Sequence, residues 1–260
     1  MKKHFLIIAT ALFLFSCNNG KSVENDTQNV SNNSSNIVFA TDFTVPFSGF
    51  WINENYYNEL LKTRSTRIAQ EKSNESFIVI TPKSTQPITM IYNVHDGGAE
   101  MIIRKTGNNY EFWSATENKK YHDIHIISEN KLKIGNISFV KLSNNTEFSN
   151  ESVQKLIGGI LFKGTYTTEN NKTITFDADG KITGLSDFQY YAPLIDYFDG
   201  GMDIDIVYLG KSTENVQGYA FAFNTDTLFL YDFKCVEILD KLGCCDSITS
   251  GELKYKLIKQ

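Results

Sequence analysis

The sequence contains little proline and little cysteine, with four residues of each among 260. The low proline count excludes a collagen-like chain, and the low cysteine count excludes a small fold that depends on many disulfide bonds. Basic residues do not outnumber acidic ones, at 25 against 30, and this balance argues against a nucleic-acid-binding protein. We therefore expect a globular protein with no nucleic-acid partner.

Histidine is also scarce, and the motifs of common enzyme classes do not occur. His122 and His125 lie three residues apart in a strand-like run, so their side chains point to opposite faces and cannot hold one metal ion. The sequence has no Gly-x-Ser-x-Gly elbow, His-Glu-x-x-His helix, Walker loop or dinucleotide fingerprint. We expect no metal, no cofactor and no catalytic residue. A hydrolase of envelope polymers is the weakest alternative, since only scattered carboxylates support it.

The N-terminus has the features of a bacterial secretion signal. Two lysines precede a mostly apolar run over residues 5–15, which is too short for a membrane-spanning helix of about 20 residues. We expect residues 1–16 to be a signal peptide that is removed. Residues 17–36 are rich in Asn and Ser and have only two apolar side chains, Val23 and Val30, so they are expected to form a flexible tether.

The sequence Leu14-Phe15-Ser16-Cys17 resembles the lipobox of bacterial lipoproteins. The resemblance implies that Cys17 is acylated and becomes the first residue of the mature chain. Removal of the two signal lysines changes the net charge from −5 to −7, and such an acidic body does not by itself adhere to anionic lipid. We therefore expect attachment to the outer membrane through the lipid on Cys17, on the periplasmic side rather than the surface.

Aromatic residues make up 13% of the chain, and they favour strands. Strand-like runs follow the tether, separated by Asn-, Gly- and Asp-rich turns. In Met202–Tyr208 apolar residues alternate with aspartates, and in Gln217–Phe223 the rings of Tyr219, Phe221 and Phe223 alternate with small residues. Further strands are expected at residues 77–81, 88–94, 99–104, 110–114, 121–128, 137–142, 227–233 and 253–258.

One segment, residues 53–70, has the periodicity of a helix instead. Its largely apolar face is formed by Tyr57, Leu60, Leu61, Arg64 and Ile68. Ser65 or Thr66 could cap a second short helix within it, because a side-chain oxygen there can accept from the following free amides. The segment is therefore expected to be one helix or a helix pair.

Three short motifs recur in the same order in the two halves of the chain. They pair Phe47–Trp51 with Phe162–Tyr166, Asp96–Met101 with Asp199–Ile204, and Val140–Leu142 with Tyr255–Leu257. The Asp-Gly-Gly sequences fit tight turns rather than a calcium or phosphate loop. We predict two diverged β modules, residues 37–148 and 149–260, with chance matching as the alternative.

The sequence Gly49-Phe50-Trp51 resembles the G-x-W signature of lipocalins. The resemblance implies a barrel in which Trp51 closes one end while the other end admits an apolar ligand. The helical segment resembles the lid of fatty-acid-binding proteins, and the first half as a whole resembles lipocalin-like lipoproteins of Bacteroidetes. In the second half Tyr166 replaces the tryptophan. The expected fold is all-β, with two tandem lipocalin-like antiparallel barrel or sandwich modules and the helical insert 53–70.

Cys235, Cys244 and Cys245 remain after lipidation. In an oxidising periplasm we expect Cys235 to pair with Cys244 or Cys245, which leaves one thiol over. Closing a loop of about ten residues would stabilise the fold by roughly 2–3 kcal/mol.

The expected function is non-catalytic binding of an apolar small molecule or of an envelope protein. Trp51, Tyr219, Phe221 and Phe223 would line a cavity if one exists. The residues Phe188, Tyr190 and Tyr191 form a second aromatic row. Core packing is the alternative role of both rows, and a structural or assembly component with filled barrels is the alternative function.

Overall fold

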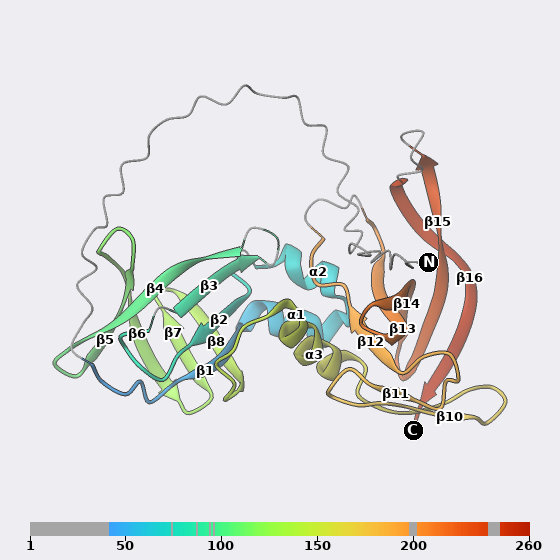
Figure 1. Ribbon diagram of the computed structural model, residues 1–260, viewed down its shortest axis with the longest axis horizontal. Coiled ribbons are helices and arrows are strands. Elements are labelled where there is room, and N and C mark those ends of the chain that lie inside the picture. Colours follow the sequence, from blue (N-terminus) through green and yellow to red (C-terminus); the bar gives the residue numbers. More distant parts are fainter. Residues whose placement is uncertain are drawn as a thin grey trace, which may run out of the picture.

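The computed structural model of the protein describes residues 42–73, 75–86, 88–93, 95, 97–197, 202–238 and 245–260. Two antiparallel sheets make up most of this part, and three short helices lie between them (Figure 1). None of the helices in these ranges is long and apolar enough to cross a membrane.

The first sheet is a closed barrel of eight antiparallel strands. Each strand pairs with the next along the chain, and β1 closes the barrel by pairing with β8. The strands are β1 (Gly49–Asn53), β2 (Phe77–Ile80), β3 (Ile88–Asn93), β4 (Gly97–Thr106), β5 (Asn109–Ser114), β6 (Lys119–Ser128), β7 (Lys131–Ile134) and β8 (Ile137–Ser143). The barrel, one of the two forms predicted for the first half, is thus present, and β7 is the strand that was not expected.

Large apolar side chains fill the interior of this barrel. Because side chains alternate along a strand, one set points inward. The inward set includes Trp51, Ile78, Ile80, Met90, Met101, Ile103, Phe112, Leu132, Ile134 and Phe139, each buried. The interior is therefore a packed core.

The predicted helical insert is a helix pair, α1 (Glu54–Thr63) and α2 (Thr66–Glu71). The side chain of Asn53 caps α1, and Ser65 caps α2 by accepting from the amide of Ile68 at 3.0 Å. Tyr56 rather than Leu61 belongs to the buried face, since Leu61 is 50% exposed.

These helices pack on the outside of the barrel, which differs from the position of a lid. Their buried side chains join the outward-facing residues Phe50, Ile52, Phe77 and Val79 of β1 and β2, and none of them joins the cluster inside the barrel. The helices form a layer between the barrel and the second sheet.

A third helix, α3 (Asn150–Leu161), was not predicted. The side chains and amides of Ser149 and Ser152 form a capping box at its start. Its residues Val153, Ile157 and Leu161 are buried at helical spacing and face the second sheet.

The second sheet also has eight antiparallel strands, but it is open. The strands are β9 (Gly164–Thr167), β10 (Thr173–Phe176), β11 (Ile182–Thr183), β12 (Tyr190–Pro193), β13 (Asp205–Ser212), β14 (Asn215–Asn224), β15 (Thr227–Ile238) and β16 (Cys245–Lys259). Their order is β11-β10-β9-β16-β15-β14-β13-β12, so neighbours in the chain pair everywhere except between β11 and β12. A barrel or sandwich was predicted for this half. The antiparallel sheet is confirmed, but it does not close into a barrel.

The two edges of the second sheet nevertheless meet at one point. Lys181 and Tyr190 form an isolated bridge, the amide of Ile182 donates to Gln189 O at 3.0 Å, and the amide of Tyr191 donates to Gly180 O at 2.8 Å. Since β11 has only two residues, the ladder cannot extend further, and the chain leaves it in the loop 184–189. We call β11, this loop and β12 the seam.

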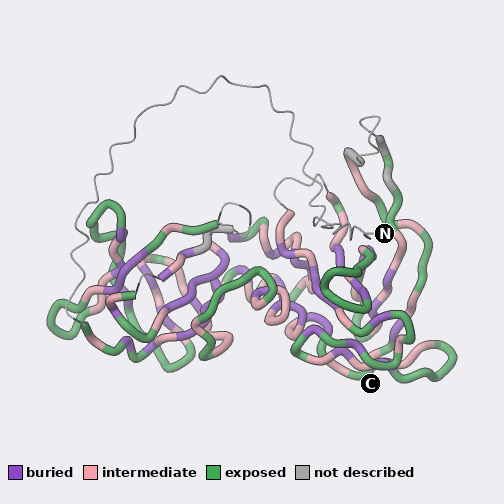
Figure 2. The backbone as a smooth tube through the Cα atoms, viewed as in Figure 1, coloured by how far each residue is buried: buried purple, intermediate pink, exposed green. Residues whose placement is uncertain are grey.

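A continuous core joins the two sheets. Buried residues run from the outer face of the barrel through α1 and α3 into the second sheet (Figure 2). Polar contacts add to it, because Asp205 of β13 accepts from Thr66 Oγ1 at 3.2 Å and from the amide of Arg67 at 3.1 Å. The predicted boundary between residues 148 and 149 falls just before α3, and the division into two domains stays a prediction.

Candidate functional site at the seam of the second sheet

Three aromatic rings meet beneath the seam. Phe188 comes from the loop 184–189, Tyr219 from β14 and Tyr255 from β16. The ring of Phe188 lies 5.7 Å from that of Tyr219 and 6.2 Å from that of Tyr255, and the two tyrosine rings are 6.3 Å apart. All three contacts are edge-to-face, the geometry that aromatic rings prefer. We call these residues the aromatic cluster.

The loop that carries Phe188 depends on a glycine. Gly184 has a φ of +89°, and a Cβ at this position would lie 2.1 Å from the carbonyl oxygen of Thr173. Only glycine can follow this path so close to β10. The loop then turns back, and the amide of Gln189 donates to Gly210 O at 2.8 Å. Phe188, between these two points, is buried against the sheet interior.

Charged side chains surround the aromatic cluster. Lys254 forms an ion pair with Asp232 at 2.7 Å, and the hydrogen bond to that carboxylate raises the pKa of the lysine. Burial is the main cause that raises the pKa of both Tyr219 and Tyr255. Nearby Asp232 and Asp187 raise the pKa of each phenol further, while Lys254 opposes them. At neutral pH the cluster therefore offers neutral phenols beside a charged ammonium group.

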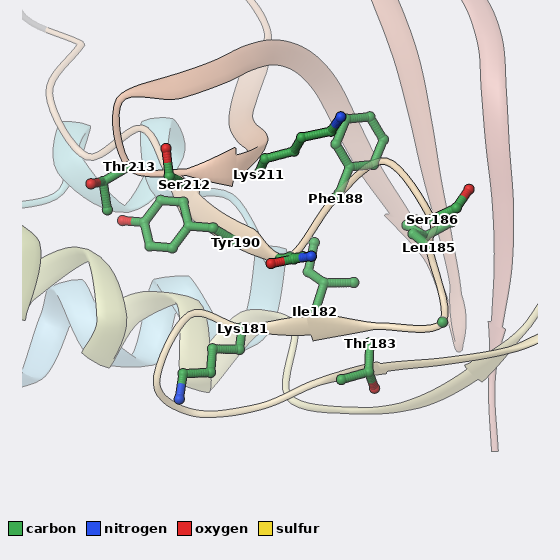
Figure 3. A pocket seen from close by; sticks show the side chains of 12 residues that line it. Lys181, Ile182, Thr183, Leu185, Ser186, Phe188, Tyr190, Lys211, Ser212 and Thr213 are labelled. Carbon is green, nitrogen blue, oxygen red and sulfur yellow. The ribbon is translucent and has the colours of Figure 1, made fainter.

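Two grooves flank the loop 184–189. The larger has a volume of about 780 Å³ and runs between β11, Phe188, Tyr190 and the turn after Lys211 (Figure 3). The smaller has a volume of about 400 Å³ and lies between the loop, the turn of residues 168–172 and Tyr255 on β16. Leu185, Ser186 and Phe188 line both grooves. The seam, the aromatic cluster and the two grooves together are the candidate site, here called the seam site.

The predicted ligand residues of β14 lie in three different surroundings. Tyr219 belongs to the aromatic cluster. Phe221 lies deeper, with its ring 5.0 Å from that of Phe162. Phe223 is at the far end of the strand, where the guanidinium of Arg64 from the barrel's helical insert lies 4.6 Å from its ring centre. The structure therefore brings only Tyr219 of this row to the seam site, and a ligand-binding role of the others stays a prediction.

Trp51 lies in the other sheet, within the barrel core. Its indole Nε1 donates to Phe47 O at 3.1 Å, and Lys141 Nζ lies 5.6 Å from its ring centre. The ring is fully buried. It thus occupies the packed interior, and its predicted contact with a ligand stays untested.

Tyr166 repeats this arrangement in the second sheet. Its hydroxyl donates to Phe162 O at 2.8 Å, and Lys259 Nζ lies 6.0 Å from its ring centre. Both first strands also open on a glycine with a positive φ, 141° at Gly49 and 150° at Gly164. The recurring motif at Phe47–Trp51 and Phe162–Tyr166 therefore has the same local geometry in both sheets.

The other two recurring motifs do not mark equivalent positions. In the pairing of the strands, Lys141 lies opposite Trp51 and Lys259 lies opposite Tyr166, so the counterpart of Lys141 is Lys259 rather than Lys256. Gly97 lies in the fourth strand of the barrel, whereas residues 199–201, which are outside the described part, precede the fifth strand of the second sheet.

Two of the three cysteines predicted to take part in a disulfide lie on the paired strands β15 and β16. Cys235 lies opposite Ile248, and Cys245 lies opposite Ile238. Cys244 lies outside the described residues, and the pairing stays a prediction that mass spectrometry with and without reduction tests.

Within the ranges that the structure describes, no group of three or more His, Cys, Asp or Glu side chains could hold a metal ion.

No family model matches the chain, and no curated protein and no solved structure is significantly similar to it.

The sequence indicated part of the seam site. Phe188 and Tyr219 stood out as members of aromatic rows, but Tyr255 and Lys254 did not, since each is a single residue within a long polar and apolar alternation. The pairing of β14, β15 and β16 brings Tyr219 and Tyr255 to one place, and the loop 184–189 lays Phe188 against both. To locate the seam site from the sequence, one would need to know that the sheet stays open between β11 and β12.

Proposed function

We propose that this protein is a lipid-anchored, non-catalytic binding protein of the bacterial cell envelope, and that its ligand binds at the seam site. The aromatic cluster carries this proposal. Rings, neutral phenols and a charged lysine converge there beside two grooves, which is the usual composition of a ligand site. The packed interior of the barrel disfavours the apolar ligand inside a module that the lipocalin resemblance implies.

Native mass spectrometry of the protein purified from its own host tests ligand binding. We expect a discrete added mass on the wild type and its loss from Tyr255→Ala, which opens the aromatic cluster. Tyr121→Ala is the matched control, because Tyr121 is 45% exposed on β6 of the barrel. Wild-type protein without added mass, or a ligand that Tyr255→Ala retains, would refute binding at the seam site.

The lipid anchor has a separate test, because Cys17 lies outside the described residues. Cys17→Ala should move the protein from the membrane fraction to the soluble fraction, since an acidic body does not by itself adhere to anionic lipid. If the variant stayed with the membrane, the anchor would be wrong.

One observation favours an assembly component of the envelope as the second candidate. The hairpin of β15 and β16 exposes Phe233, Val236 and Leu253, at 37%, 63% and 49%. Exposed apolar side chains on one hairpin are typical of a protein contact. A photo-crosslinker at position 236 in growing cells should then give one discrete adduct that a crosslinker at Tyr121 does not give.

A further inference from the structure

The seam site has a charge opposite to that of the whole chain. The chain carries a net charge of −5, yet the residues that line the two grooves include five lysines and only two acidic residues. The lysines are Lys172, Lys181, Lys211, Lys254 and Lys256. A local positive field on an acidic protein attracts a small anion, while the body repels a long polyanion.

These lysines differ in whether an acidic side chain already forms an ion pair with them. Lys254 pairs with Asp232, and Lys256 pairs with Glu169 at 3.1 Å. Lys211 forms no ion pair with any residue that the structure describes, and no acidic side chain lines the larger groove. Figure 3 shows Lys211 extending over this groove from the end of β13, whereas Lys181 points away from its centre. Lys211 is therefore the cation most available to a ligand in the larger groove.

The remaining lining is polar and aromatic. In the larger groove, Ser186, Gln189, Ser212 and Thr213 supply hydroxyl and amide groups beside the ring of Phe188. In the smaller groove, Tyr255 supplies a phenol. An apolar ligand would leave these groups without hydrogen bonds, which is costly. A ligand that carries many hydroxyl groups would satisfy them.

An extended peptide fits this place less well. Peptides that add to a sheet use the free backbone groups of an edge strand. At the seam the facing edges already bond each other, through Ile182 to Gln189 and Tyr191 to Gly180. Recognition there must use side chains instead.

We propose that the seam site binds an acidic saccharide, a short oligosaccharide that carries carboxylate groups. This inference rests on the proposed binding function and names its ligand class. The C–H face of a sugar ring packs against Tyr190, a half-buried ring that lines the larger groove with Lys211. The hydroxyl and amide groups exchange hydrogen bonds with the sugar hydroxyls, and Lys211 meets the carboxylate through a charge-assisted hydrogen bond.

Calorimetric titration of the full-length protein in detergent, with tetragalacturonate and its methyl ester as probes, tests the charge requirement. The two probes share the same sugar chain, and the ester replaces each charged carboxylate with an uncharged methyl ester. We expect the acid to bind at least about tenfold more tightly than the ester, and its affinity to fall with salt. Equal affinity of the ester, or tighter binding of tetraglutamate or of a tetranucleotide, would overturn the assignment.

A variant pair locates the binding. Lys211→Gln should weaken binding of the acid about five- to tenfold and leave the ester unchanged. Lys62→Gln is the control, because Lys62 is an exposed lysine of α1 that pairs only across one helical turn with Glu59. Equal effects of the two variants would refute the role of Lys211. If the folded protein binds no saccharide, the inference of an acidic saccharide ligand is wrong. The proposed binding function is tested separately, by the added mass in native mass spectrometry.

Discussion

At the scale of single residues, two tyrosines at the junction of the sheets, the buried Tyr56 and the half-buried Tyr197, have opposite hydrogen-bonding states. The hydroxyl of Tyr197 lies 3.1 Å from Thr66 Oγ1 and accepts from the amide of Ile206 at 3.0 Å. Among the residues that the structure describes, the hydroxyl of Tyr56 has no partner. Burial raises the pKa of both phenols, and Asp205 adds to it. Both hydroxyl groups lie at the same junction, and they differ in whether a hydrogen-bond partner is present.

Removing each hydroxyl should therefore have opposite effects. Tyr197→Phe leaves the amide of Ile206 without its acceptor, so we expect the free energy of unfolding to fall by about 1–3 kcal/mol. Tyr56→Phe deletes an unpaired polar group, so stability should stay unchanged or rise by up to about 2 kcal/mol. Denaturant unfolding of both variants measures the difference, and a loss of stability in Tyr56→Phe would mean that its hydroxyl has a partner.

The buried phenols also predict instability in alkali. Burial is the main cause that raises the pKa of Tyr166 to about 12, and it raises the pKa of Tyr191 and Tyr197 as well. Above about pH 10 the unfolded chain ionises these groups while the folded chain keeps them protonated. Each group then lowers stability by up to about 1.4 kcal/mol per pH unit as the pH rises. Urea unfolding between about pH 8 and 11 measures this, and a flat profile above about pH 10 would contradict it.

At the scale of elements, the helices show what the sequence could predict. The insert after β1 was predicted because its apolar residues have helical spacing and Ser65 is a good cap. The helix α3 has the same signals, with Ser149 at its start and Val153, Ile157 and Leu161 at helical spacing. It was missed because Gly158-Gly159 in its last turns is unfavourable in a helix.

Contacts explain why one of these glycines is needed. A Cβ on Gly158 would lie 2.9 Å from the ring of Tyr191 and 3.3 Å from Pro193, whereas a Cβ on Gly159 would meet Ala178 at an ordinary 3.5 Å. The close approach of α3 to β12 thus depends on Gly158 alone.

Alanine at each position separates packing from helix propensity. Gly159→Ala should raise stability by about 0.5–1 kcal/mol, because alanine favours the helix. Gly158→Ala gains the same propensity but forces the ring of Tyr191 to move, so we expect a net loss of about 1–2 kcal/mol. Thermal unfolding of the pair measures both signs, and a stabilised Gly158→Ala would show that α3 can shift away from β12.

At the scale of the whole molecule, the individual strands were easier to predict than whether each sheet closes into a barrel. The alternation of Tyr219, Phe221 and Phe223 predicted a strand with one aromatic face, and β14 has it. Whether β11 and β12 join depends on the two-residue length of β11 and on the loop after Gly184, which no periodicity reveals. The seam site therefore follows from topology, while the strands around it follow from local pattern.

The junction between the sheets should make them unfold together. Asp205 of β13 holds the first turn of α2 through Thr66 and the amide of Arg67. The chain has two tryptophans, and both Trp51 and Trp113 lie in the barrel. Tryptophan fluorescence thus follows the barrel alone, whereas circular dichroism follows both sheets. In the wild type we expect the two signals to change at the same denaturant concentration, because one core crosses the junction.

Loss of the Asp205 carboxylate should separate these transitions. Asp205→Ala leaves the amide of Arg67 without its acceptor and leaves the hydroxyl of Thr66 with Tyr197 as its partner, which costs about 1–3 kcal/mol at the junction only. The fluorescence and circular dichroism midpoints should then differ, with one sheet unfolding before the other. Asp203→Ala is the matched control, since Asp203 is exposed two residues earlier in the chain. Coincident transitions in Asp205→Ala would mean that the apolar core alone couples the two sheets.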